Sequence, residues 1–183
     1  TPEEQTLVDR FRRGEDSAFD GIVERHSAEV AALANRLLGW PGDVDDVVQE
    51  VFLAAFAARR RFRGDCRLRT WLFTITINKC RSHRLRWKRR LRPLRVEAEA
   101  LAYPGGHSDR AAMDAEALAA VRQAVQALPP KYREVVVLRY LEDMDTKEIC
   151  ELLGITLNSL QVRLNRARNK LRQQLGDSFK ENS

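Results

Sequence analysis

The chain has 183 residues, a formal net charge of +6, and a composition that is 44% hydrophobic and 32% charged. These values are typical of a folded, soluble protein and exclude an intrinsically disordered one. The longest apolar run, residues 51–57, is too short to cross a membrane, and the N-terminus lacks a signal-peptide pattern. Three widely spaced cysteines exclude a disulfide framework and a zinc knuckle, so we expect a cytoplasmic protein without a metal or cofactor.

Helical periodicity dominates the chain from its start. Apolar side chains recur at intervals of three and four from residue 7 to residue 37, with an interruption at residues 14–17. We expect two helices here, the second capped by Asp16 or Ser17. His26 falls on the apolar side of the second helix, and we expect a core histidine rather than a metal ligand. Because strand-like alternation never persists for more than a few residues, the predicted fold is all-α.

The next predicted helix, residues 43–59, begins with a group of acidic and amide side chains. They are Asp43, Asp45, Asp46, Gln49 and Glu50. The positive end of the helix dipole favours such acids, which is one explanation. A metal site is another, but no histidine accompanies the carboxylates and their spacing does not bring them to one side of a helix. An acidic surface that docks a protein partner fits better.

A strongly basic segment follows, from Arg59 to Arg95. It holds fifteen lysines and arginines against one acid, Asp65, and aromatic side chains are interleaved with them. Such a segment repels itself unless a polyanion neutralises it, and nucleic acid is the commonest polyanion. Interleaved rings and arginines suit unpaired bases, whereas a solvated basic helix with core aromatics is the alternative. Within the segment we expect a turn at residues 62–65 and a long helix at residues 67–90.

The last third of the chain follows a predicted linker at residues 93–112, which contains Pro104-Gly105-Gly106. Pro129-Pro130 ends one helical pattern and starts the next, and residues 146–172 have the pattern of a helix-turn-helix. We expect Gly154 at the corner and Thr156 as the cap of the last helix.

The last helix has two contrasting sides. Its apolar stripe consists of Leu157, Leu160, Leu164, Ala167 and Leu171. The other side carries Asn158, Ser159, Gln161, Val162, Arg163, Asn165, Arg166 and Arg168. Amides, hydroxyls and arginines are the side chains that contact base edges and phosphates in a major groove, so we expect this helix to bind duplex DNA.

Together these segments resemble a bacterial RNA polymerase sigma factor of the extracytoplasmic-function (ECF) group. The match rests on DVDDVVQEVFLAAF from Asp43, FRGDCRLRTWLFTITIN from Phe62, and LPPKYREVVVLRYLEDMDTKEICELLGI from Leu128 with SLQVRLNRARNKLR from Ser159. The resemblance implies two helical domains, regions 2 and 4, at residues 1–92 and 113–183. It also implies core RNA polymerase, promoter DNA and an anti-sigma factor as partners, and no enzymatic activity.

The resemblance assigns three roles to the candidate residues. The acidic group from Asp43 to Glu50 would dock on the clamp helices of the polymerase largest subunit, and the segment from Tyr132 to Leu141 would hold the polymerase flap. The last helix would bind the −35 element as duplex. The −10 element, melted to a single strand with a base flipped into the protein, would be contacted by Phe62, Arg63, Gly64, Asp65, Arg67, Arg69, Asn78, Lys79, Arg81 and Arg84.

Two departures and two alternatives accompany this interpretation. Relatives often have Val-Lys-Ser-Arg where this chain has residues 160–163, Leu-Gln-Val-Arg, so their base preferences do not transfer. Ser82-His83 likewise replaces a common Asp-His pair. A stand-alone helix-turn-helix regulator with an N-terminal sensor or dimerisation domain is the main alternative. A metal-dependent nuclease using the acids near Asp43 is remote, because no nucleophile–base pair or histidine cluster supports it.

Overall fold

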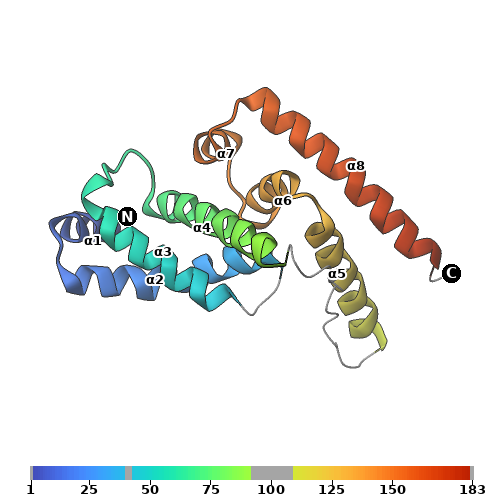
Figure 1. Cartoon of the computed structure of the whole chain (residues 1–183), viewed down its shortest axis with the longest axis horizontal. Helices are drawn as coiled ribbons and strands as arrows, with labels where there is room; N and C mark the ends of the chain where they lie inside the picture. The colour runs from blue at the N-terminus through green and yellow to red at the C-terminus, as the bar shows by residue number, and fades with distance from the viewer. Residues whose placement is uncertain (1, 40–42, 92–108, 182–183) are drawn as a thin grey trace.

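The structure is a computed structural model that describes residues 2–39, 43–91 and 109–181. Every regular element in these ranges is helical, so the fold is all-α, as predicted (Figure 1). The first group is α1 (Pro2–Arg13), α2 (Asp16–Leu38), α3 (Val44–Ala58), the short 3-10 turn η2 (Arg59–Arg61) and α4 (Leu68–Leu91). The second group is α5 (Asp109–Ala127), α6 (Pro130–Val136), the π-helical turn η3 (Val137–Leu141), α7 (Thr146–Leu153) and α8 (Leu157–Glu181).

In the first group, α2, α3 and α4 pack against one another, and α1 lies against α2. Aromatic rings join these helices: the centroids of Phe19 and Phe56 are 4.9 Å apart, and those of Phe62 and Trp71 are also 4.9 Å apart. His26 is buried on α2, as expected, and its Nδ1 lies 3.1 Å from Glu29 Oε2. These contacts give the acidic helix α3 and the basic helix α4 a common core.

The start of α2 differs from the prediction by one residue. Its N-cap is Glu15, so the expectation of Asp16 or Ser17 was wrong. The hydroxyl of Ser17 is occupied elsewhere, because Arg10 Nη2 donates to Ser17 Oγ over 3.0 Å. Arg10 Nε also donates to Glu15 Oε2 over 2.7 Å. The α1–α2 turn is therefore closed by an arginine rather than by a side-chain cap.

In the second group, α8 packs against α5, α6 and α7. The predicted corner is confirmed: Gly154 has a φ of 64° in the left-handed region that favours glycine. Thr156 caps α8 as expected, because its Oγ1 accepts a hydrogen bond from the Ser159 N–H over 3.2 Å. Leu160, Leu164 and Ala167 are buried, but Leu157 is 51% exposed, so the core-facing stripe of α8 begins at Leu160 rather than Leu157.

The two groups of helices also contact each other. Helix α4 packs against α7, and α2 contacts α5, α6 and η3, which places the basic helix beside the second group (Figure 1). Most of the predicted linker lies outside the described residues, but residues 109–112 belong to α5. The C-terminal boundary predicted at residue 113 is therefore four residues inside a helix.

Candidate nucleic-acid and protein interfaces

The five predicted partner-docking residues of α3 separate into two sets. Asp45, Asp46 and Gln49 are exposed, as a docking surface requires. Glu50 instead turns toward α4, where its carboxylate lies 3.3 Å from Lys79 Nζ and 2.9 Å from Arg86 Nη2. Asp43 lies 3.8 Å from His83 Nδ1. The acids at either end of the group thus join α3 to α4, and the three between them face solvent.

The Glu50 carboxylate is held in its charged form. Burial by itself raises the pKa of Glu50, but hydrogen bonds from Lys79 and Arg86 and their positive charges outweigh it, so the pKa lies below the ordinary value. Lys79 was predicted to contact DNA, and in this structure its ammonium group instead pairs with Glu50.

The loop between η2 and α4 presents most of the residues predicted to contact the single strand. Arg63, Gly64, Asp65 and Arg67 are exposed, and Gly64 has a φ of 83°, a conformation that favours glycine. Phe62 is the exception, because it is only 4% exposed and its ring packs on Trp71. The structure therefore makes Phe62 a core residue that anchors the loop, and its side chain does not face solvent.

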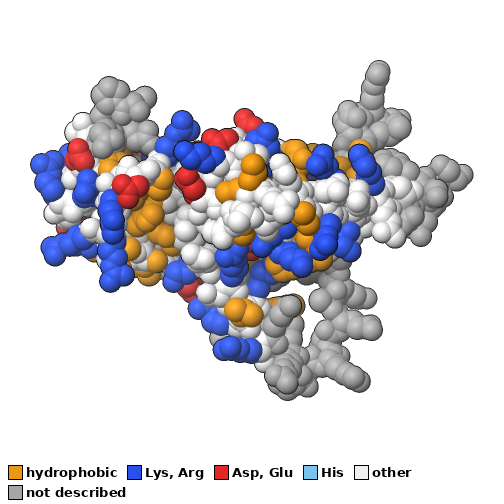
Figure 2. All heavy atoms as spheres, turned by 90° about the horizontal axis from the view of Figure 1, so that it is seen from above, with side chains coloured by type: hydrophobic (Ala, Val, Ile, Leu, Met, Phe, Trp, Pro, Cys, Tyr) orange, Lys and Arg blue, Asp and Glu red, His pale blue; other side chains and the backbone are white. Residues whose placement is uncertain are grey.

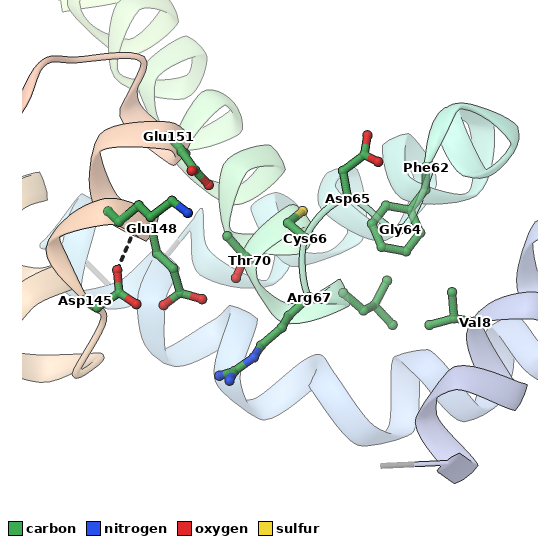
Figure 3. Close-up of a pocket in the computed structure, with 12 residues that line it drawn as sticks. Val8, Phe62, Gly64, Asp65, Cys66, Arg67, Thr70, Asp145, Glu148 and Glu151 are labelled. Carbon is green, nitrogen blue, oxygen red and sulfur yellow. Dashed lines mark hydrogen bonds between the residues drawn. The ribbon is translucent and has the colours of Figure 1, made fainter.

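A cleft of about 530 Å³ separates this loop from α7 (Figure 3). Gly64, Asp65, Cys66 and Arg67 line it from one side, and three acids of α7 and its cap line it from the other: Asp145, Glu148 and Glu151. We noted the basic neighbours of Cys66 in the sequence as a reason for a lowered thiol pKa. The structure reverses this: burial, and then the charges of Asp65, Glu151 and Glu148, raise the pKa of Cys66.

Along α4, only part of the predicted DNA-contacting set is exposed to solvent. Asn78 is exposed. Arg69 Nη2 donates to Glu142 Oε2 over 2.9 Å, and its guanidinium also lies 4.4 Å from the centre of the Phe73 ring. Arg81 forms a two-pronged pair with Glu134, with Nε to Oε1 at 2.9 Å and Nη2 to Oε2 at 2.6 Å. Burial lowers the pKa of Arg84 below its ordinary value.

The outer side of α8 agrees with its predicted exposure. Asn158, Gln161, Val162, Asn165, Arg166 and Arg168 are exposed, and Ser159 and Arg163 are half-buried. Arg166 lies beside the Tyr132 hydroxyl and lowers the pKa of the tyrosine, so α6 helps to hold this arginine. Figure 2 shows lysine and arginine side chains spread over much of the face seen from above, with acidic side chains confined to small patches.

The sequence analysis missed four charged residues that join the two groups of helices: Arg36, Arg133, Glu134 and Glu142. The last three are each less than 9% exposed. The one available signal was the occurrence of charged residues within an otherwise apolar stretch at residues 132–141. Among the residues that the structure describes, no cluster of side chains suits a metal ion, and no helix has the length and apolar character needed to span a membrane.

Comparison with known proteins agrees with this layout. The family model for sigma-70 region 2 matches residues 22–90, and the model for sigma-70 region 4 matches residues 118–171. The ECF RNA polymerase sigma-E factor of Escherichia coli strain K12 is 31% identical to this chain, covering 92% of each protein. The chain belongs to the ECF group of the sigma-70 family. Helices α1–α4 are hereafter called region 2, and helices α5–α8 are called region 4.

Two solved structures share the architecture of this sigma factor. CnrH in complex with the cytosolic domain of CnrY has a TM-score of 0.68 and 31% identity, covering 95% of this chain and 97% of that one. The sigma factor RpoE of Bartonella quintana, in complex with the anti-sigma factor NepR, has a TM-score of 0.70 and 24% identity, covering 86% and 96%. As an ECF sigma factor, the protein is not an enzyme: it binds core RNA polymerase and directs promoter-specific initiation at −10 and −35 elements.

Proposed function

We propose that this sigma factor divides initiation among three surfaces, and that Asp45, Asp46 and Gln49 of α3 form the polymerase surface. The supporting observation is that these three side chains are exposed on the helix that directly precedes the basic loop. Asp43 and Glu50, which we also expected to contact polymerase, have partners on α4 and serve to orient α3. A negative patch held at a fixed angle on a rigid helix suits docking to a positively charged partner.

The second surface contacts the melted −10 strand. Its exposed part is the loop from Arg63 to Arg67, continued along α4 by Asn78. The glycine at position 64 leaves the backbone open to a close approach by a base, and the arginines on either side hold phosphates. Arg69, Lys79, Arg81 and Arg84 belong to the same surface, and they reach DNA only after exchanging their present surroundings for phosphates.

The third surface is the outer side of α8, which contacts the −35 duplex. Its N-terminal turn is fixed by Gly154 and Thr156, so Asn158, Ser159 and Gln161 are presented at the end of the helix that enters the major groove. Val162 and Asn165 add apolar and amide contacts, and Arg163, Arg166 and Arg168 supply the cations for bases and phosphates.

A regulatory partner and a location complete the proposal. CnrH was solved with the cytosolic domain of CnrY, and RpoE of Bartonella quintana was solved with the anti-sigma factor NepR. By analogy, an anti-sigma factor holds this protein in the cytoplasm, where polymerase and promoter DNA are found. We propose domain limits of 1–92 for region 2 and 109–183 for region 4, with the linker between them.

The polymerase surface is tested by charge reversal at its centre. Asp46→Lys in the full-length protein should weaken its binding to core RNA polymerase at least tenfold in a pull-down or fluorescence titration. Asp20→Lys is the matched control, because Asp20 is an exposed acid on α2 outside the proposed surface. Equal binding by the two variants would contradict the assignment of Asp46 to the polymerase surface.

A further inference from the structure

Two glutamates of region 4 occupy arginines that region 2 offers to DNA. Glu134 of α6 accepts both prongs of Arg81, and Glu142 beyond η3 accepts Arg69 at 2.9 Å and pairs with Arg36. The side chains of these glutamates are 7% and 5% exposed, so the carboxylates lie inside the contact between the regions. A two-pronged arginine–carboxylate pair has the geometry that arginine also uses for a phosphate.

The same contact completes the C-terminal end of α2. The last carbonyl groups of a helix have no partner within it. Region 4 supplies donors: Gln126 Nε2 bonds to the Arg36 carbonyl over 2.9 Å, and Arg133 Nη1 bonds to the Leu37 carbonyl over 2.7 Å. Gly39 ends α2 with a φ of 87°, and a Cβ built there would lie 2.2 Å from Gln126 Oε1. The end of α2 is thus shaped for the approach of α5.

Arg133 connects the regions through buried hydrogen bonds. Besides the carbonyl of Leu37, it donates to the carbonyls of Gln126 and Leu128 at the end of α5. One guanidinium therefore joins the ends of α2 and α5, where a cation also interacts favourably with both helix dipoles. Region 2 and region 4 are in this way matched by directed hydrogen bonds as well as by charge.

This contact is polar enough to be reversible. Burial raises the pKa of Glu142, and the neighbouring arginines offset that effect only in part. Burial lowers the pKa of Arg133 to about 10, so its charge is also poorly solvated. Because desolvation opposes the attraction in both cases, the ion pairs select one arrangement without making it strongly stable.

Promoter binding requires a different arrangement. The −10 and −35 elements are about 25 base pairs apart, or roughly 80 Å of duplex at about 3.4 Å per base pair. A compact chain of this length has a radius of gyration of about 16 Å. With region 4 against α4, the two DNA-binding surfaces therefore cannot reach both elements at once.

We propose that in the free protein region 4 acts as an intramolecular acidic partner of region 2, in which Glu134 and Glu142 mask Arg81, Arg69 and Arg36 from DNA. The acids of α7 that face the 63–67 loop across the cleft extend the same negative surface (Figure 3). Docking on polymerase separates the regions and releases the arginines. The DNA consequence rests on the proposed −10 surface, whereas the contact between the regions does not.

The test is a distance measurement on the full-length free protein by double electron–electron resonance. Spin labels are attached at Leu53→Cys on α3 and Asn169→Cys on α8, both exposed, in a Cys66→Ser, Cys150→Ser background. Wild-type side chains at positions 134 and 142 should give one narrow distance distribution. Glu134→Lys with Glu142→Lys places like charges against the three arginines and should broaden the distribution and shift it to longer distances.

A matched control separates this effect from net charge. Asp20→Lys with Glu24→Lys makes the same charge change at two exposed positions of α2 and should keep the narrow distribution. Arg81→Glu alone should open the protein, and combining it with Glu134→Lys should restore closure by exchanging the two charges. A broad distribution in the wild-type protein, or an unchanged one in the Glu134→Lys, Glu142→Lys variant, would overturn the contact.

Masking has its own readout, the anisotropy of a fluorescent single-stranded DNA oligonucleotide at low salt. The Glu134→Lys, Glu142→Lys protein should bind it at least tenfold more tightly than the Asp20→Lys, Glu24→Lys control. If the regions separate but the two affinities are equal, the masking of DNA-binding arginines is overturned. Because the distance measurement contains no DNA, it does not depend on the −10 assignment.

Discussion

Phe62 and Arg63 are adjacent residues with opposite environments. Phe62 is in the core against Trp71, and Arg63 is exposed on the loop. Removing each side chain should therefore affect a different property of the protein. Phe62 sets the position of the loop, whereas Arg63 contributes a charge to what the loop binds.

Phe62→Ala should lower the free energy of unfolding by about 3 kcal/mol or more, as is usual when a buried phenylalanine is truncated. Arg63→Ala should change it by less than about 0.5 kcal/mol and should weaken −10 strand binding by the polymerase holoenzyme. Urea denaturation and a strand-binding titration measure the two effects. Unchanged stability of Phe62→Ala would contradict its placement in the core.

Glu50 makes a pH-dependent contribution. Its native pKa lies below the ordinary value of about 4.3, so the ionised carboxylate stabilises the fold at pH above that value. The contribution is lost as the pH falls through the native pKa. We expect Glu50→Gln to be less stable than wild type near pH 7, by less than about 1 kcal/mol because the pair is partly exposed, and equally stable near pH 2. Thermal unfolding across this range measures the difference, and a difference that grows on acidification would contradict the ion pair.

At the scale of elements, the helix-turn-helix was predictable because its signals are local. A glycine that can adopt a positive φ, a threonine three residues before the N–H that it caps, and an apolar stripe all lie within a few turns. The stripe failed only at Leu157, in the first turn of α8. Periodicity states which side of a helix is apolar, but it does not state where along the helix the neighbouring elements begin.

The cap of α8 offers a test at this scale. Thr156→Ala removes the acceptor of the Ser159 N–H and should destabilise region 4 by about 0.5–2 kcal/mol. Because the first turn carries residues assigned to the −35 element, duplex binding should weaken as well. Thr156→Ser retains the hydroxyl and is the control. Equal stability of the Ala and Ser variants would show that the cap contributes nothing.

At the scale of the whole molecule, the sequence predicted the two sets of helices and most of the exposed candidate residues, but not how region 4 contacts region 2. Arg81 and Glu134 are 53 residues apart, and Arg36 and Glu142 are 106 apart. No local pattern states which of many charges meet across such distances. The sequence likewise gave no sign that Lys79, predicted to bind DNA, and Glu50, predicted to bind polymerase, would pair with each other.

The two levels of organisation make different demands on the same arginines. Within the free protein, Arg69 and Arg81 are neutralised by region 4, which limits the repulsion expected of a strongly basic helix. On a promoter, phosphates take the place of the glutamates. The acidic residues of α3 remain exposed in the closed arrangement, so polymerase can bind before the regions separate.

Run-off transcription with purified core RNA polymerase tests the central claim most directly. Genomic fragments from the source organism serve as templates, and the start sites are mapped. We predict discrete transcripts that depend on this protein, begin downstream of two motifs at a constant spacing, and are lost with Asp46→Lys but retained with Asp20→Lys. Tight binding to duplex DNA without polymerase, together with no specific transcript in its presence, would contradict the account.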